Sequence, residues 1–373
     1  MKRIFWAIQQ LDRIGGTETV SIEIMNRLAS DYEIVLLSTS ANPDPWVYKL
    51  DERIQVRSLE LPAELGRFDQ EYSKLKGHPF KRLALIHKLI KHYFWKKGRY
   101  RKQIAKMMDR EDDIYIGSSL DSYLLAPKND KRVIFHFHFD EKSFLNGGFQ
   151  MAMGISRKPS NWVFLSASCL DAITKKKPKL SSSSVYIYNP IRFKRTCTEP
   201  PFKGKLLFVG RYSEQKDPLF ALSIMKELKG KPYHLDMYGD GHLKEKMLQY
   251  QKDNGLDNVS IHDGKFLSKE DFQDSDLLLL TSAYEGFCLV KGEASVNSLP
   301  CISTKWVGPI DEVFENGKDG FVIDSKDPKE YAKRIDEILS DREKESSLRK
   351  STYEASKRFD DGDIIAKWKD LLG

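Results

Sequence analysis

Two glutamates, Glu285 and Glu293, lie eight positions apart in the stretch AYEGFCLVKGEAS, directly after the apolar run LLLL at 277–280. The apolar run is typical of a buried parallel strand, and the residues after it predict a helix that begins near Phe287–Cys288. Backbone N–H groups at such a helix start bind anions, because they are unpaired and lie at the positive end of the helix dipole. A carboxylate accepts hydrogen bonds from two hydroxyls, so each glutamate could bind a vicinal diol. The alternative is that Glu285 caps the helix and Glu293 is a surface residue. The N–H groups concerned belong to Gly286, Phe287, Cys288 and Leu289.

Two cations follow an earlier apolar run, in the stretch FVGRYSEQKD. Arg211 comes just after the strand-like residues 206–209, and Lys216 comes five positions later. Ligands of parallel sheets bind beyond the carboxyl ends of the strands, so both side chains would lie near such a site. The planar guanidinium and the compact ammonium both bind phosphate oxygens, and together they could hold a diphosphate. The alternative is a pair of exposed loop charges.

A third strand-like run, RIFWAI, is followed by a loop that contains Gly15 and Gly16 and leads into a helix-like segment. The free N–H groups of that helix start could also receive a phosphate. The loop does not have the GxGxxG pattern of dinucleotide-binding proteins, which disfavours a nicotinamide or flavin enzyme. Taken alone, the glycine pair is more typical of a tight turn.

The elements that must position these residues alternate between short strands and helices of about 10 to 15 residues, in two successive series. Such alternation predicts an α/β protein with parallel sheets covered on both faces. We expect two doubly wound, Rossmann-like domains facing a cleft, joined near residues 190–204 by a polar linker that has two prolines after Pro190. The expected domains are residues 1–192 and 203–355, and residues 356–373 form an amphipathic helix that crosses back to the first domain.

Composition limits the classes of protein that the chain can belong to. It has 373 residues, which favours two domains over one. Its four cysteines form no close pair, which argues against a disulfide framework or a zinc site. We find neither a signal peptide nor an apolar run of membrane-spanning length, and we therefore expect a cytoplasmic protein.

The net charge of +7 is concentrated in one segment. Residues 74–110 contain thirteen lysines and arginines against one acidic residue, Asp109, with apolar and aromatic residues interspersed. This pattern predicts a basic amphipathic helix, which could lie on an anionic membrane or bind a polyanion. The alternative is a solvated helix whose apolar side packs on its own domain. No nucleic-acid-binding module accompanies the charge, so we expect no nucleic-acid partner.

Five segments, in order along almost the whole chain, resemble the retaining GT-B glycosyltransferases of family four, which belong to the glycosyl transferases of group 1. EGFCLVKGEA resembles the E-x7-E motif of that family, and FVGRYSEQKD resembles its Gly-Arg to Lys loop. YGDGHLKEKM is similar to its Gly-x-Gly turn and helix, and GGTETVSIEI to its N-terminal glycine loop. LPCISTKWVGPIDEVFENGKDGFVI is similar to its closing strand, loop and helix.

The resemblance implies roles for individual residues. Arg211 and Lys216 would hold the diphosphate of the donor, and Glu293 would bind the ribose hydroxyls. Glu285 and the backbone at Phe287–Leu289 would bind the donor sugar and the distal phosphate. The family also has a histidine near the transferred sugar, and RVIFHFHFDEK offers two candidates. The strand alignment favours His138, and His136 stays possible because strand alternation puts both on one face.

The implied activity is that of a retaining glycosyltransferase, a hexosyl- or N-acetylhexosaminyltransferase that uses a UDP-sugar and no metal. The expected acceptor is a lipid-linked surface glycan, as in capsule, O-antigen or exopolysaccharide synthesis. The enzyme would then work in the cytoplasm, peripherally on the inner face of the membrane. Two alternatives remain, namely transfer to a protein or a teichoic acid, and a non-catalytic partner subunit that binds nucleotide sugars.

The chain departs from the family pattern in places. Family members usually carry apolar residues where this chain has Lys291-Gly292. Trp306 could stack on a base or a sugar, or could equally pack in the interior. The DSD triplet at 274–276 is similar to the metal-binding carboxylate pair of the other large glycosyltransferase fold. It precedes a strand instead of following one, so we expect a turn.

Overall fold

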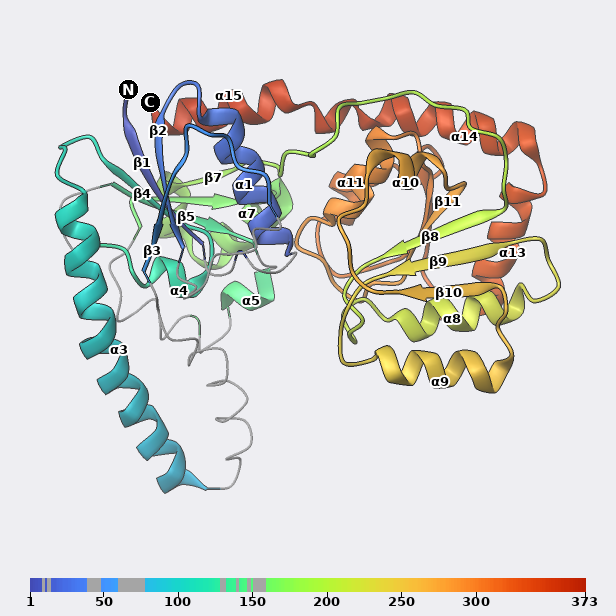
Figure 1. Ribbon diagram of the computed structural model, residues 1–373, viewed down its shortest axis with the longest axis horizontal. Helices are drawn as coiled ribbons and strands as arrows, with labels where there is room; N and C mark the ends of the chain where they lie inside the picture. Colours follow the sequence, from blue (N-terminus) through green and yellow to red (C-terminus); the bar gives the residue numbers. More distant parts are fainter. Residues whose placement is uncertain are drawn as a thin grey trace. The chain divides into compact units, whose positions relative to one another are not determined.

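The chain forms two compact units, each with its own parallel sheet (Figure 1). The first unit comprises Met1–Ile187 and Trp368–Gly373, and the second comprises Tyr188–Lys367. The division therefore falls just before Pro190, at the start of the segment expected to be a linker. The computed structural model describes residues 1–8, 11, 15–38, 48–59, 78–127, 132–138, 141–145, 149 and 159–373.

The sheet of the first unit has seven parallel strands in the order β3-β2-β1-β4-β5-β6-β7. Six of them coincide with the strand-like runs of the sequence, because five have apolar, buried interiors and β7 carries the run SVY, which is half-buried. The short β3 was not predicted, because its residues are polar and mostly exposed. The strands are β1 (Arg3–Ile8), β2 (Glu33–Ser38), β3 (Gln55–Ser58), β4 (Ile114–Gly117), β5 (Arg132–Phe137), β6 (Asn161–Phe164) and β7 (Ser184–Tyr186).

The helices of the first unit include the expected basic helix, α3, which is 29 residues long. Its C-terminal end packs into the core through the buried Ile104 and Met108. At its other end, Phe80 and Leu83 are 86% and 66% exposed, and Figure 1 shows this end extending beyond the sheet. Residues 74–77 of the basic segment lie outside the described residues. The helices are α1 (Gly16–Leu28), α3 (Pro79–Met107), α4 (Leu120–Tyr123), α5 (Glu141–Leu145), α7 (Ala167–Lys176) and the 3-10 helix η1 (Pro178–Ser183).

The sheet of the second unit has six parallel strands in the order β10-β9-β8-β11-β12-β13. Its central strand, β11, is the LLLL run, which is buried along its whole length, as expected for a strand covered on both faces. The loops after β8, β11 and β12 meet at one edge because these strands are parallel neighbours. The strands are β8 (Lys205–Val209), β9 (His234–Tyr238), β10 (Val259–His262), β11 (Leu277–Leu280), β12 (Cys301–Thr304) and β13 (Gly320–Ile323).

Helices cover both faces of this second sheet. Figure 1 shows α8 and α9 on one side and α10 and α11 on the other. Leu277 and Leu279 of β11 belong to the core cluster that contains the buried residues of α8 and α13. Each unit thus has the parallel-sheet architecture expected from the alternation of strands and helices. The helices are α8 (Pro218–Glu227), α9 (Lys244–Asn254), α10 (Lys269–Gln273), α11 (Leu289–Val296), α12 (Ile310–Val313), α13 (Pro328–Leu339), α14 (Arg342–Ala355), η2 (Ser356–Phe359) and α15 (Asp361–Leu372).

The end of α15 belongs to the first unit. Trp368 is fully buried there, and its ring lies 5.3 Å from that of Trp6 in β1. The ammonium group of Lys2 donates a hydrogen bond of 3.1 Å to the carbonyl of Leu372. The last turn of the chain is therefore part of the core of the first unit.

Gly320, the first residue of β13, has a backbone that only glycine adopts without strain. Its φ is +133°, and a Cβ built on it would lie 1.8 Å from the carbonyl oxygen of Cys301 in β12. We expect Gly320→Ala to lower the free energy of unfolding by about 3 kcal/mol, because strand pairing must shift to make room. Gly317→Ala is the matched control, since Gly317 also has a positive φ but open space around it, and should cost about 1 kcal/mol. Equal losses in urea unfolding would contradict this account of Gly320.

Candidate functional site

Lys216 and Glu285, expected separately from the sequence, form one ion pair in the second unit. The ammonium Nζ of Lys216 lies 2.5 Å from Oε1 of Glu285, and Ser282 donates a second hydrogen bond of 2.5 Å to the same oxygen. The side chain of Glu285 is 7% exposed and that of Lys216 is 18% exposed. Burial lowers the pKa of Lys216, but the negative charge of Glu285 and its hydrogen bond outweigh this and leave the pKa raised. Lys216 is therefore a protonated cation.

Backbone contacts tie the loops around this pair to one another. The amide of Ala283 donates to the carbonyl of Gln215 at 2.8 Å, which joins the loops after β11 and β8. The hydroxyl of Thr281 donates to the carbonyl of Lys216 at 2.7 Å. The amide of Glu285 donates to the carbonyl of Val307 at 3.0 Å, which adds the loop after β12. Three neighbouring strand ends therefore fix the position of the ion pair.

Gly308 allows the third loop to approach this closely. Its φ is +141°, and a Cβ built on it would lie 2.1 Å from the carbonyl oxygen of Glu285. A larger residue would push apart the loops that hold the ion pair. This role could not be predicted from the sequence, because it depends on a contact between residues on two different loops.

Arg211 is exposed, at the end of β8. Among the described residues its side chain has no hydrogen-bond or ion-pair partner, whereas Lys216 is paired with Glu285. Arg211 is therefore the cation of the FVGRYSEQKD stretch whose charge remains available to an anion. Both side chains come from the loop after β8, as the sequence predicted.

Helix α11 begins at Leu289, slightly later than the expected start near Phe287–Cys288. The delay has a physical cause, since Cys288 has the left-handed conformation, with φ 60° and ψ 67°. The backbone amides of residues 286–288 have no acceptor among the described residues. They are thus donors available to an anion, beside the Lys216–Glu285 pair.

Burial and the negative charge of Glu285 raise the pKa of the Cys288 thiol to about 12, so this thiol stays protonated.

Glu293 is neither fully exposed nor isolated. Nε of Arg192 donates to its Oε1 at 2.5 Å, and the two side chains are 16% and 12% exposed. Arg192 lies in the segment between β7 and β8, about one hundred positions before its partner, and sequence analysis did not single it out.

The departure from the family at Lys291-Gly292 is explained by packing. Lys291 is fully buried and pairs with Asp319 at 2.8 Å, donates to Ser295 Oγ at 2.6 Å, and lies 4.6 Å from the ring of Phe314. The buried charge is thus compensated. A Cβ on Gly292 would lie 2.4 Å from Cδ1 of Ile191, so a larger residue would clash with the segment that carries Arg192.

Trp306 packs in the interior, which was one of the two alternatives that the sequence left open. It is 3% exposed, and its ring meets that of Phe314 edge to face, with centroids 6.4 Å apart. Its buried face is not available for stacking on a ligand.

The carboxylates of the DSD triplet are structural, and the triplet forms the expected turn before β11. Oδ2 of Asp276 accepts hydrogen bonds from the amides of Lys203 and Lys205, at 3.0 and 2.8 Å. Asp274 pairs with the ammonium groups of the same two lysines. Over the described ranges, no group of three or more histidine, cysteine or acidic side chains is placed to hold a metal.

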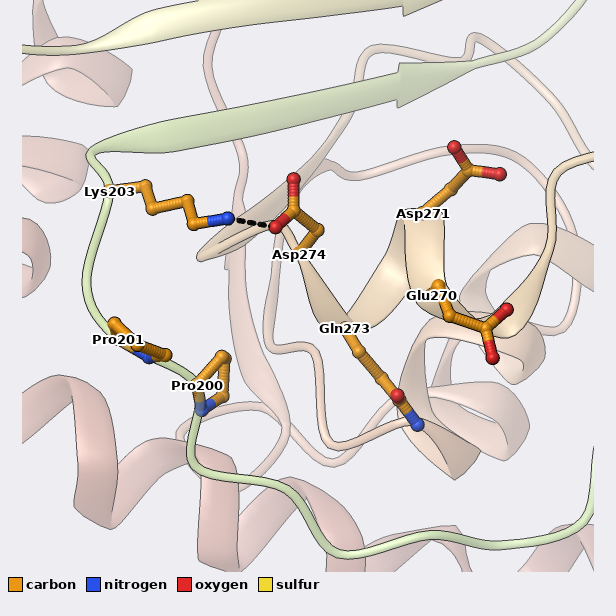
Figure 2. A pocket seen from close by; sticks show the side chains of 7 residues that line it. All are labelled: Pro200, Pro201, Lys203, Glu270, Asp271, Gln273 and Asp274. Carbon is orange, nitrogen blue, oxygen red and sulfur yellow. Dashed lines mark hydrogen bonds and ion pairs between the residues drawn. The ribbon is translucent and has the colours of Figure 1, made fainter.

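Asp274 also lines a pocket of about 410 Å³ on the second unit (Figure 2). Figure 2 shows Lys203 pointing toward Asp274, so a cation and a carboxylate of the lining neutralise each other. None of the residues expected to bind the donor lines this pocket. Its lining residues are Pro200, Pro201, Lys203, Glu270, Asp271, Gln273 and Asp274.

The two candidate histidines of the first unit contact each other at the carboxyl end of β5. Nε2 of His138 lies 3.0 Å from Nδ1 of His136, so both side chains do share one face. His136 is within the strand and 1% exposed, whereas His138 follows the last strand residue and is half-buried. Burial lowers the pKa of His138 to about 3, and burial with the nearby His138 lowers that of His136 well below its usual value. Both rings are therefore neutral near pH 7, and the expected place of His138 near the transferred sugar stays a prediction.

Gly15 is the N-cap residue of α1, and its amide is already bonded. It donates to the hydroxyl of Tyr48 at 2.8 Å, while its carbonyl accepts from the amide and hydroxyl of Thr19. Glu18 places a negative charge in the first turn. These contacts fit the turn reading better than the phosphate site predicted at Gly15 and Gly16. Residues 9–10 and 12–14 of this loop lie outside the described part of the chain.

Comparison with known proteins finds a family match within the second unit. Residues 193–355 match the family model "Glycosyl transferases group 1". Over its whole length the chain is 23% identical to a Campylobacter jejuni protein, and the match covers 98% of that protein. Its name is GalNAc-alpha-(1->4)-GalNAc-alpha-(1->3)-diNAcBac-PP-undecaprenol alpha-1,4-N-acetyl-D-galactosaminyltransferase.

Solved structures with the same fold include two proteins seen with UDP. S. aureus TarM, as a G117R mutant in complex with fondaparinux, alpha-GlcNAc-glycerol and UDP, has a TM-score of 0.79 at 14% identity, and each chain is covered in full. Anabaena HepE in complex with UDP and glucose has a TM-score of 0.73 at 16% identity, covering 100% of this chain and 99% of HepE. At these identities the likeness shows the fold.

The neutral histidine pair predicts a pH dependence of stability. The unfolded chain protonates His138 below a pKa of about 6.5, whereas the folded protein does so only near pH 3. Between these values the unfolded state binds more protons, so stability falls as pH falls, by about 1.4 kcal/mol per pH unit for one such histidine. We expect His138→Gln to reduce this slope below pH 6.5 in equilibrium unfolding. His87→Gln, which removes an exposed histidine of α3, is the control and should leave the slope unchanged. Parallel curves for wild type and His138→Gln would contradict the prediction.

Proposed function

We propose that this glycosyltransferase, whose residues 193–355 match the glycosyl transferases of group 1, transfers a hexose or N-acetylhexosamine from a UDP-sugar with retention of configuration. The observation that carries the donor assignment is the set of anion donors at one edge of the second sheet. The free amides of residues 286–288, the unpaired Arg211 and the Lys216–Glu285 pair come from loops that are bonded to one another. Amides at a helix start and a guanidinium are the groups that bind phosphate oxygens.

The charges of this set favour a dianion over a neutral ligand. Lys216 and Glu285 neutralise each other, so the net charge comes from Arg211 and the positive end of α11. Lys216 has three N–H donors, and the hydrogen bond to Glu285 uses one of them. The remaining donors can bind a phosphate oxygen while Glu285 binds a sugar hydroxyl through its second oxygen.

The proposed reaction places the chemistry on the donor. The bond between the anomeric carbon and the leaving phosphate oxygen breaks, and an acceptor oxygen bonds to the same face of that carbon. The acceptor proton goes to the leaving phosphate. Arg211, Lys216 and the amides stabilise the charge that develops on this phosphate, which is the role a metal has in other transferases. Oε1 of Glu285 already accepts two hydrogen bonds, which suits a positioning group better than a covalent nucleophile.

The acceptor we propose is a lipid-linked surface glycan. The similar C. jejuni enzyme has an undecaprenol-linked acceptor in its name, and the match spans both chains. None of the described helices has the length and apolar character of a membrane span. We therefore propose peripheral contact with an anionic membrane, through α3 and its exposed Phe80 and Leu83. A teichoic acid is the alternative acceptor, since the basic residues of α3 suit a polyanion equally well.

Removal of the donor-site charges should strongly reduce turnover. We expect Lys216→Ala and Glu293→Ala to lower kcat/KM for the preferred nucleotide sugar about a hundredfold or more, because each removes a charged contact to the donor. The preferred donor is found first by screening UDP-, GDP- and ADP-sugars for turnover. Lys226→Ala, an exposed cation on α8, is the control and should retain full activity. Wild-type activity in both site variants would refute the donor assignment.

The membrane proposal predicts that two exposed apolar residues matter. We expect Phe80→Ser/Leu83→Ser to weaken co-sedimentation with vesicles rich in phosphatidylglycerol about tenfold or more, because each side chain contributes apolar area to the membrane interface. Leu248→Ser, on the 44% exposed Leu248 of α9, is the control and should bind like wild type. Binding to a soluble polyanion but not to the vesicles would favour the teichoic-acid acceptor instead.

A further inference from the structure

Arg192 and Glu293 form a contact that the proposed reaction does not use. Nε of Arg192 donates to Oε1 of Glu293 at 2.5 Å, and both side chains are mostly buried. One partner lies in the segment that joins β7 to β8, and the other lies in α11, whose N-terminus forms the proposed phosphate site. The pair therefore connects the start of the second unit to the donor site of the same unit.

The guanidinium of Arg192 lies near two aromatic rings in addition to its bond to Glu293. It lies 4.3 Å from the ring centroid of Phe193 and 5.4 Å from that of Phe266. The neighbouring side chain packs on the same helix, since a Cβ built on Gly292 would lie 2.4 Å from Cδ1 of Ile191. Contacts between a guanidinium and aromatic faces restrict the side chain to one orientation. Arg192 thus presents Nε to Glu293 from a rigid position.

A fixed arginine changes what the carboxylate of Glu293 can do. A nucleoside diphosphate is strongly anionic, and an uncompensated carboxylate at its binding site would repel it. Arg192 cancels that charge. An ionised carboxylate accepts about four hydrogen bonds, so a carboxylate that is held by an arginine can also accept hydroxyl groups.

We propose that Arg192 is a positioning residue for the donor nucleoside, which orients the carboxylate of Glu293 toward the ribose hydroxyls and neutralises it. This inference rests on the proposed function, because it assumes that Glu293 meets the ribose of a nucleotide-sugar donor. The ligand chemistry is that of a ribonucleoside diphosphate with a free 2′,3′-diol. Loss of Arg192 should then weaken recognition of the ribose specifically, which loss of a merely structural contact would not do.

The test compares ribonucleotides with their 2′-deoxy forms. Binding of UDP, GDP and ADP is measured by isothermal titration calorimetry, followed by the 2′-deoxy form of the nucleotide that binds best. We expect wild-type protein to prefer the ribonucleotide about tenfold or more, because the deoxy form leaves a site acceptor without its partner. Arg192→Gln and Glu293→Gln should each remove most of this preference. The double variant should be no worse than Glu293→Gln alone, since both changes act through one carboxylate.

Two further variants distinguish a positioning role of Arg192 from an effect of its charge. Unfolding measurements distinguish both from a loss of the fold. Arg192→Lys keeps the charge without the planar group, and should restore part of the affinity for the ribonucleotide but little of the preference over the deoxy form. Lys194→Gln removes an exposed cation from the same segment and should leave the preference unchanged. The thermal unfolding midpoint of each variant shows whether the protein remains folded.

The outcomes distinguish this inference from the proposed function. If Arg192→Gln keeps the wild-type preference while Glu293→Gln loses it, the role of Arg192 is refuted and the donor site stands. If Lys194→Gln loses the preference as well, the effect is one of general charge and the positioning role is also refuted. If wild-type protein binds no nucleotide, or binds both forms equally, the ribose role of Glu293 fails and the role of Arg192 fails with it.

Discussion

The ion pair between Lys216 and Glu285 is the contact on which the arrangement of the second unit's donor site depends. Each partner lies on a loop that leaves a different strand, and removing one would leave the other charged and mostly buried, which typically costs about 3–5 kcal/mol. The loops are also bonded through their backbones, and Gly308 brings a third loop against the carbonyl of Glu285. The free amides at the start of α11 follow directly from Glu285, so their direction is set by the same contact. The same contacts therefore set both the positions of the loops and the charges at the donor site.

A second buried pair holds the helix itself. Lys291 and Asp319 are both fully buried at 2.8 Å, and Arg358 also pairs with Asp319. A buried ion pair contributes little net stability, because desolvation opposes the Coulombic attraction, but it tolerates few alternative geometries. An apolar residue at position 291 could slide against its neighbours, whereas the ammonium must meet its partner. The polar pair thus fixes the position of α11 where the family usually relies on apolar packing.

The sequence predicted the elements better than the contacts between them. The strands were found because apolar runs such as LLLL are short, buried and bounded by polar residues, and β3 was missed because it is polar. The same-face arrangement of His136 and His138 followed from strand alternation and is confirmed. The pairing of Lys216 with Glu285 and of Arg192 with Glu293 could not be predicted, because 69 and 101 positions separate the partners and no local rule links them. The late start of α11 depends on the left-handed Cys288, which no residue preference indicates.

The Lys216–Glu285 and Arg192–Glu293 pairs together determine the net charge of the donor site. Each carboxylate near the start of α11 is matched by one cation, Glu285 by Lys216 and Glu293 by Arg192, so the carboxylates that would bind hydroxyls do not repel a diphosphate. Arg211 and the helix amides then provide positive potential at the site. If the carboxylates were unpaired, the same residues would carry net negative charge, and an anionic donor would be excluded despite its available hydrogen bonds. Pairing is thus what allows one short stretch of chain to bind both the hydroxyls and the phosphates of a single ligand.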